Sequence, residues 1–133
     1  MSLKPMRGKN GLEMHAERLV SDLSADNLDG LVIPGGWAPD KLRRYESVIE
    51  ITRAMNERRR IIGIICHGGS VAISAGIVAG RRVTGSLGIR DDLVNAGGIF
   101  VDTPALRDGN QVWGRVVADI PAFCRELVAA LAD

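Results

Sequence analysis

Short apolar runs alternate with segments of helical periodicity along this chain. Residues 31–33 and 61–65 consist almost entirely of apolar residues, which is typical of strands buried in a parallel sheet between layers of helices. Between these runs, side chains suited to a core recur at helical spacing, at Val48, Ile51, Thr52 and Met55. The pattern predicts a strand, a helix and a second strand, in that order.

The remaining segments predict shorter elements. The other strands are expected over residues 11–18, 83–84, 99–106 and 111–115, with a turn at 107–110 between the last two. The other short helices are expected over residues 68–75 and 91–96, and residues 22–29 predict a loop with one helical turn.

The last helix is the clearest element of the pattern. Asp119 suits the N-cap position, and Pro121 suits the first turn. One apolar stripe follows, made of Ile120, Phe123, Cys124, Leu127, Val128 and Leu131. We expect this stripe to pack on the sheet, with Cys124 as a small buried hydrophobic side chain.

Alternating strands and helices with short connections indicate an α/β fold with a mostly parallel sheet. The length of 133 residues fits a single domain over residues 1–133. In such sheets, ligands bind beyond the carboxyl ends of the strands, at the loops that lead into helices. Two loops of this kind, residues 34–40 and 66–70, are rich in glycine, so we expect the functional site there.

Composition and charge exclude several classes of function. The 17 basic and 16 acidic side chains give a net charge of +1, which indicates no nucleic-acid partner. No apolar run is long enough to span a bilayer and no signal peptide is recognisable, so we expect a cytoplasmic protein with no membrane partner. The two cysteines and two histidines lack zinc-site spacing, and no nucleotide-binding motif occurs, so we expect no metal and no cofactor.

The strongest chemical signal is Cys66, which follows the apolar run 61–65 and precedes His67 and two glycines. A strand that runs into a cysteine and then into a helix has the layout of a nucleophile elbow. The helix N-terminus stabilises the thiolate there, and the His67 amide points toward a developing oxyanion. Most free cysteines are simply small buried side chains, but the turn position favours the nucleophile. His67 is a candidate base, although we expect its ring to reach the neighbouring sulfur only with difficulty.

The second glycine-rich loop, Pro34-Gly-Gly-Trp-Ala-Pro-Asp40, has two interpretations. A strand stop followed by a capped helix explains every residue in it. The functional interpretation adds the Gly36 amide as a second oxyanion donor and Asp40 as a charge partner for His67. Taken alone, the loop favours the structural interpretation.

Several segments in order resemble the ThiJ/PfpI family of intracellular cysteine protease-like proteins, within the class I glutamine amidotransferase-like superfamily. They are residues 29–40, 64–68, 75–82, 89–92, 95–97, 101–102 and 118–123. The resemblance implies a flavodoxin-like three-layer sandwich with Cys66 as nucleophile and His67 beside it. It also implies that Gly36, His67 and Gly68 form the oxyanion and substrate-binding surface. Asp40 would be presented to the histidine of a neighbouring subunit, so a homo-oligomer is expected.

Family activities include peptidase, glyoxalase or deglycase, hydratase and chaperone-like protection in stress, so the resemblance implies a small-molecule or peptide substrate without fixing which. Trp37 stands where the family often has Arg. The family opens with a strand, a helix and a second strand, and its first loop carries a Glu beside the thiol. We expect this chain to be truncated at its N-terminus by that unit, which leaves residues 31–33 as an exposed sheet edge.

Three hypotheses therefore stand beside one another. The first is a cysteine hydrolase or deglycase-like enzyme that uses Cys66, His67 and Asp40. The second is a non-catalytic, oligomeric stress or chaperone-like relative. The third is a truncated, inactive form whose full-length counterpart is the enzyme.

Overall fold

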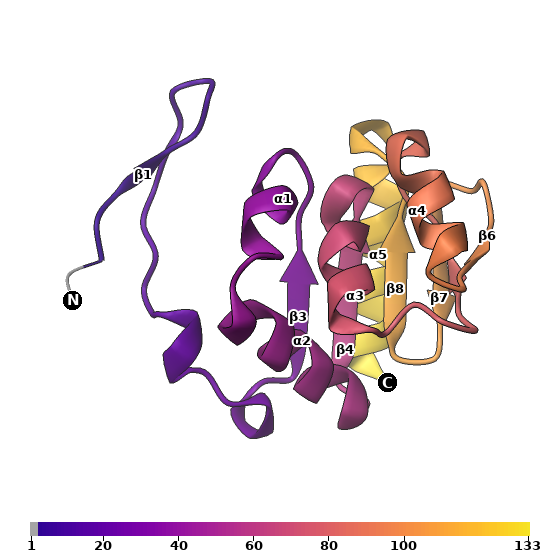
Figure 1. Cartoon of the computed structure of the whole chain (residues 1–133), viewed down its shortest axis with the longest axis horizontal. Coiled ribbons are helices and arrows are strands. Elements are labelled where there is room, and N and C mark those ends of the chain that lie inside the picture. The colour runs from indigo at the N-terminus through magenta and orange to yellow at the C-terminus, as the bar shows by residue number, and fades with distance from the viewer. Residues whose placement is uncertain (1–2) are drawn as a thin grey trace.

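A four-stranded sheet forms the centre of the computed structural model, which describes residues 3–133 (Figure 1). Its strands are β3 (Gly30–Ile33), β4 (Ile61–Ile65), β7 (Ala105–Asp108) and β8 (Gln111–Gly114), in the spatial order β3-β4-β8-β7. The first three in space are parallel to one another, and β7 runs antiparallel to β8. The prediction of a mostly parallel sheet is confirmed.

Helices cover both faces of this sheet. One face carries α2 (Glu46–Glu57) and α3 (Gly69–Ala75), with α4 (Arg90–Asn95) beside α3 and α1 (Ala38–Leu42) following β3. The other face carries α5 (Ile120–Ala132). The molecule therefore has three layers, with the sheet between helices on its two faces.

Alternation along β4 explains how the two faces are filled, because successive side chains of a strand point to opposite sides. Ile62 and Ile64 are fully buried in the core under α2 and α3. On the opposite face, Gly63 leaves room for α5, since a Cβ there would lie 3.0 Å from the side chains of Leu127 and Phe123. The small residue on the strand therefore lets α5 approach the sheet closely.

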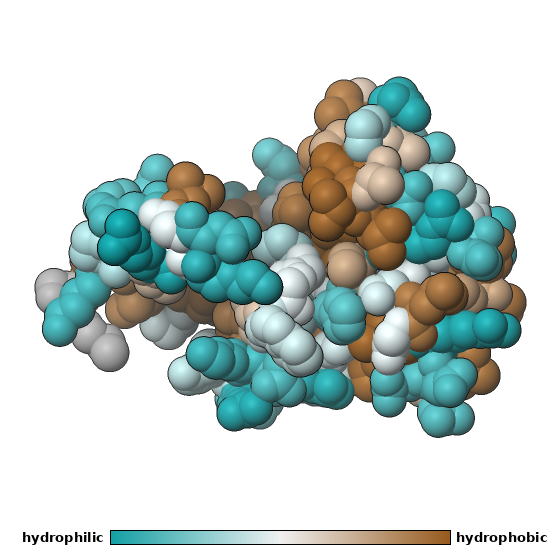
Figure 2. Space-filling view, turned by 90° about the horizontal axis from the view of Figure 1, so that it is seen from above, coloured by the Kyte–Doolittle hydropathy of each residue, from teal (hydrophilic) through white to brown (hydrophobic). Residues whose placement is uncertain are grey.

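Two pairs of very short strands lie outside the central sheet. β1 (Met6–Arg7) and β2 (Glu13–Met14) form an antiparallel hairpin that stands apart from the body of the molecule in Figures 1 and 2. β5 (Arg82–Val83) and β6 (Ile99–Phe100) form a parallel pair. The predicted strand over residues 11–18 is thus reduced to two residues, because this exposed segment pairs with the two residues of β1 and lies outside the central sheet.

The predicted strand over residues 99–106 is wrong as a single element. The chain leaves β6 after Phe100 and enters β7 at Ala105, so residues 101–104 connect two different sheets. Pro104 lies in this connection and has no amide hydrogen to donate to a ladder. The predicted turn over 107–110 shortens to Gly109 and Asn110, because β7 and β8 pair up to Asp108, and a two-residue hairpin loop suits the strand twist.

The last helix is confirmed, but its buried face is narrower than predicted. Phe123 and Ala130 are buried, whereas Cys124 and Val128 are exposed. The interpretation of Cys124 as a buried hydrophobic side chain is therefore wrong. Asp119 makes no side-chain cap, because its carboxylate is bound by an arginine described below.

β3 lies at one edge of the sheet, as expected for residues 31–33, and Val32 is 51% exposed there. The carboxyl ends of β3 and β4 lie at the same edge of the parallel sheet, where both glycine-rich loops begin. None of the helices among residues 3–133 is long and apolar enough to cross a membrane.

Candidate active site

Cys66 occupies the sharp turn between β4 and α3. Its backbone φ is +58°, and among residues 3–133 only Arg59 shares a positive φ outside glycine. A left-handed conformation costs a residue with a Cβ about 1–2 kcal/mol, and such strain clusters at functional sites. A short 3-10 turn, Cys66–Gly68, then leads directly into α3. The half-buried thiol is thereby held at the carboxyl edge of the sheet.

The turn at Cys66 is packed tightly by the loop that follows β3. A Cβ added to Gly35 would lie 2.8 Å from the Cβ of Cys66, and one on Gly68 would lie 2.6 Å from the carbonyl oxygen of Ile33. Real Cβ atoms do not approach other atoms so closely, so both positions require glycine. The two glycine-rich loops therefore lie directly against each other, as their place at the sheet edge predicts.

A third segment closes the turn from the other side. The amide of Ser86 donates a hydrogen bond to the Cys66 carbonyl oxygen at 3.4 Å. A Cβ on Gly85 would lie 3.0 Å from that same oxygen, and one on Gly88 would lie 3.3 Å from Nε2 of His67. Residues 85–88 thus pack against both the backbone of Cys66 and the ring of His67.

The imidazole of His67 lies beside the thiol of Cys66, with Nδ1 3.4 Å from Sγ. The expectation that this ring reaches its neighbour's sulfur only with difficulty is wrong, because the tight turn after Cys66 places the two side chains together. Whether Nδ1 of His67 acts as donor or acceptor toward the sulfur depends on the tautomer of the ring. A thiol and an imidazole at this distance are suited to proton transfer between them.

A cleft of about 320 Å³ opens beside His67. Its lining includes Gly36, Trp37 and Asp40 from the loop after β3 and the start of α1, together with Ser70 and Asp92. Figure 2 looks onto this carboxyl edge of the sheet, where hydrophobic and hydrophilic residues are mixed. The cleft adjoins the Cys66–His67 pair through His67.

Gly36 and Asp40 lie on this cleft in different ways. Gly36 has a φ of +75° and open space around its missing Cβ, so the backbone conformation there, and not packing, favours glycine. The carboxylate of Asp40 accepts a hydrogen bond at 2.5 Å from Arg44, which lies two residues beyond the end of α1. In the part of the chain that the structure describes, no hydrogen bond or ion pair joins Asp40 to His67. The structure brings Cys66 and His67 together and leaves Asp40 apart from them.

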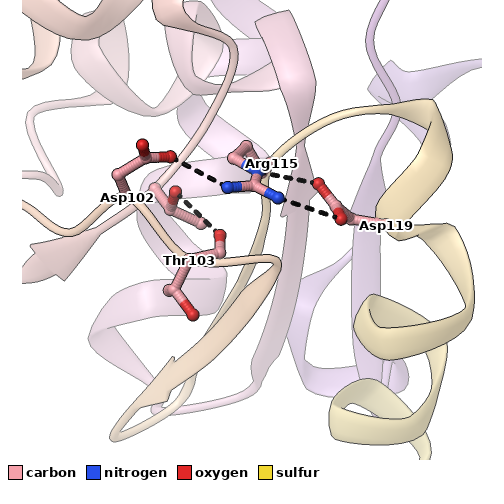
Figure 3. Close-up of polar contacts among 5 residues, drawn as sticks. Asp102, Thr103, Arg115 and Asp119 are labelled. Carbon is pink, nitrogen blue, oxygen red and sulfur yellow. Dashed lines mark hydrogen bonds and ion pairs between the residues drawn. The ribbon is translucent and has the colours of Figure 1, made fainter.

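A cluster of three charged residues, Arg115, Asp102 and Asp119, lies at the carboxyl end of β8, on the same edge of the sheet (Figure 3). Arg115 follows β8, and its guanidinium donates to both carboxylate oxygens of Asp119, at 2.9 and 3.3 Å, and to Asp102 at 3.0 Å. The hydrogen bonds from Arg115 hold the pKa of the Asp119 carboxyl below its usual value. The start of α5 and the connection between β6 and β7 are thereby tied to the end of β8.

Sequence reasoning missed several residues of this edge. Ser70 and Asp92 line the cleft from α3 and α4, and their place there depends on how those helices meet. Arg115 carried no motif, and its role as a hub depends on a loop that joins two separate sheets. Among residues 3–133, no three His, Cys, Asp or Glu side chains gather in a way that would hold a metal ion.

Comparison with known proteins places these features among relatives. The model of the DJ-1/PfpI family matches residues 1–130. Deglycase PfpI of Pyrococcus furiosus is 40% identical over 124 residues, which are 93% of this chain and 75% of that protein. General stress protein 18 of Bacillus subtilis is 37% identical over 130 residues, which are 96% of this chain and 76% of that protein.

A solved structure gives the same picture for the fold. A two-domain protein of Anabaena variabilis, with DJ-1/ThiJ/PfpI-like and ferritin-like domains, superposes with a TM-score of 0.94 at 31% identity. The match covers 97% of this chain and 37% of that one. The flavodoxin-like three-layer fold expected from the resemblance is confirmed.

Proposed function

This chain belongs to the DJ-1/PfpI family, and we propose that it acts as a cysteine hydrolase or deglycase with Cys66 as the nucleophile. One observation carries the proposal: Cys66 sits in a left-handed turn between strand and helix with the His67 Nδ1 3.4 Å from its sulfur. Relatives named as deglycases at 40% identity support the same class of chemistry.

The proposed reaction begins with transfer of the thiol proton from Sγ of Cys66 to Nδ1 of His67. The sulfur then forms a bond to an electrophilic carbonyl carbon, and the π electron pair of that carbonyl moves onto its oxygen. For an amide substrate, the oxyanion collapses, the carbon–nitrogen bond breaks, and the leaving nitrogen takes the proton from His67. Water then attacks the thioester, which releases the acid and restores the thiol.

Three backbone amides are proposed to stabilise the oxyanion of this intermediate. Gly36 approaches from the loop after β3, and His67 and Gly68 lie at the start of the helical turn. Donors of this kind reduce the barrier because they are already oriented when charge develops. The close packing of Gly35 and Gly68 supports the proposal, since it holds the two loops in a fixed relation.

We keep Asp40 as an acidic partner supplied to His67 by a second copy of the chain. Asp40 is exposed at the rim of the cleft and is held by Arg44, so its own chain does not direct it to His67. Mixing the variants Cys66→Ala and Asp40→Asn tests this arrangement. If the sites are shared between subunits, randomly mixed dimers recover about a quarter of the wild-type activity. If Asp40 acts within its own chain or not at all, mixing gives no more than the sum of the separate variants.

The experiment for the proposed activity compares Cys66→Ala with Cys124→Ala on two substrates. One is a peptide modified with methylglyoxal, and the other is the unmodified peptide with a chromogenic amide. We expect Cys66→Ala to abolish turnover and Cys124→Ala to keep it, because Cys124 lies exposed on α5 away from the cleft. Equal activity of the two variants would contradict Cys66 as nucleophile.

The name of the Bacillus subtilis stress protein favours one second candidate, a protective role without catalysis. In that case the variant Cys66→Ser would protect a heat-stressed reporter enzyme from aggregation as well as the wild type does. A protective effect that disappears with the thiol supports the enzyme instead.

A further inference from the structure

We propose that Trp37 is a specificity-determining residue that receives a flat, aromatic group of the substrate. This inference rests on the proposed function, because it names the kind of substrate that the Cys66 site takes. Trp37 lines the cleft, and the residue is 77% exposed. Its place on the cleft sets it apart from the other exposed apolar side chains, because a tryptophan offers a ligand both a large apolar face and an N–H group.

The contrast with the second tryptophan supports a role outside the core. Trp113 is fully buried, and its Nε1 donates a hydrogen bond to Oε1 of Gln111 at 3.2 Å. It therefore has the packing and the polar partner that a structural tryptophan needs. Trp37 has an exposed ring, which a ligand with an apolar face would cover with a gain in free energy.

The position of Trp37 relative to the thiol makes that gain relevant to the reaction. Its ring centroid is 6.5 Å from that of His67, with the planes tilted by 35°, and His67 in turn lies 3.4 Å from the sulfur of Cys66. His67 thus links the thiol, which lies beside the cleft, to the indole, which lines it. A substrate whose ring rests on Trp37 therefore lies beside the imidazole that contacts the thiol, and we expect its carbonyl group to extend past His67 toward Cys66.

The rest of the cleft limits what else the substrate carries. Its volume of about 320 Å³ is at the small end of ligand pockets. Ser70 and Asp92 line the same space and provide hydroxyl and carboxylate groups for hydrogen bonds to polar parts of a ligand. The chemical class that fits is a small carbonyl compound or amino-acid derivative with one aromatic ring and one or two polar groups.

Two alkylating reagents that share the iodoacetamide group and differ in a phenyl ring test the proposal directly. Iodoacetamide is small and has no ring, whereas N-phenyl iodoacetamide carries a phenyl group. Both are applied at low concentration, and mass spectrometry measures labelling rates at Cys66 and at Cys124 in the same sample. We expect the rate ratio of phenyl to plain reagent to be about two- to tenfold higher at Cys66 than at Cys124, since aromatic pairing adds that much. Cys124 is the internal control because it is exposed on α5.

Variants of Trp37 decide whether the ring causes the difference. Trp37→Ala should bring the ratio at Cys66 down to the ratio at Cys124, and Trp37→Phe should keep part of it. An unchanged ratio in Trp37→Ala overturns the proposal. The ratio is independent of how reactive the thiol is, since both reagents meet the same sulfur. A slow but phenyl-selective Cys66 therefore contradicts the proposed function alone, and a fast but unselective one contradicts this inference alone.

A second reading of the exposed ring is that another copy of the chain covers it. Acrylamide quenching of tryptophan fluorescence separates the two, because Trp113 is buried and Trp37 supplies the quenchable signal. We expect quenching that is independent of protein concentration and reduced by N-acetyl-phenylalaninamide. Quenching that falls as protein concentration rises, with no effect of that probe, assigns Trp37 to a subunit interface and overturns the proposal.

Discussion

Replacing Cys66 by alanine and by glycine measures the backbone strain on which the proposed site depends. At most positions a glycine is less stable than an alanine by roughly 0.5–1 kcal/mol, because glycine loses more freedom on folding. At Cys66 the φ of +58° reverses this preference, because the left-handed backbone conformation strains alanine, which has a Cβ, and does not strain glycine. The same pair of substitutions at Cys124, inside α5, has no such reversal.

The magnitude follows from the difference between the two sites. At Cys66, glycine removes the left-handed cost of about 1–2 kcal/mol that alanine has. It loses stability through its larger backbone entropy and the absence of one half-buried methyl group. The glycine variant should therefore be as stable as the alanine variant or more stable. At Cys124, alanine should be better by about 1 kcal/mol. The alanine-to-glycine change should therefore differ between the two positions by about 1–2 kcal/mol, since the entropy of glycine enters both.

Urea unfolding of the four variants, followed by circular dichroism, gives the four free energies. Equal slopes of the unfolding free energy against urea concentration show that the variants expose the same amount of surface on unfolding. If alanine is preferred at both cysteines by the same amount, Cys66 is not held in a strained nucleophile elbow.

Two further substitutions test the packing and the charge at this edge of the sheet. Gly35→Ala puts a Cβ 2.8 Å from that of Cys66, so it should slow the alkylation of Cys66 and lower the free energy of unfolding by about 1–3 kcal/mol. The control Gly80→Ala, with a φ of +76° and open space, should lower the free energy of unfolding by about 1 kcal/mol and leave the alkylation rate of Cys66 unchanged. Equal alkylation rates of Cys66 in both variants would contradict the contact. Asp119→Asn should destabilise the protein at neutral pH, because the lowered pKa of Asp119 means that its pairing with Arg115 stabilises the fold above the unfolded value near 3.9. The gap in urea midpoint between wild type and this variant should therefore narrow as pH falls below about 4, and a gap that stays constant to pH 2.5 would refute the pairing.

The sequence predicts the local parts of this structure well because their signals are local. The strands β3 and β4 are marked by apolar runs, and the turn at Cys66 is marked by the glycines that follow it. Resemblance to a family adds the meaning of the two loops, which periodicity alone leaves open.

Features that depend on distant segments could not be predicted in the same way. Asp119 has the right position for a helix cap, but Arg115 competes for its carboxylate with two direct hydrogen bonds. Cys124 fits an apolar stripe in sequence, but it is exposed because α5 meets the sheet along the line of Phe123, Leu127 and Ala130, to one side of Cys124. The pairing of Trp37 with His67 likewise depends on how two loops meet across the sheet edge.

The most direct test of the central claim is to trap the covalent intermediate. The protein is mixed with a chromogenic amide substrate, quenched in acid within the first turnover, and digested for mass spectrometry. We expect an added acyl mass on the peptide that contains Cys66, present in wild type and absent in Cys66→Ser. Turnover without any adduct at Cys66, or an equal adduct on Cys124, would contradict Cys66 as the nucleophile.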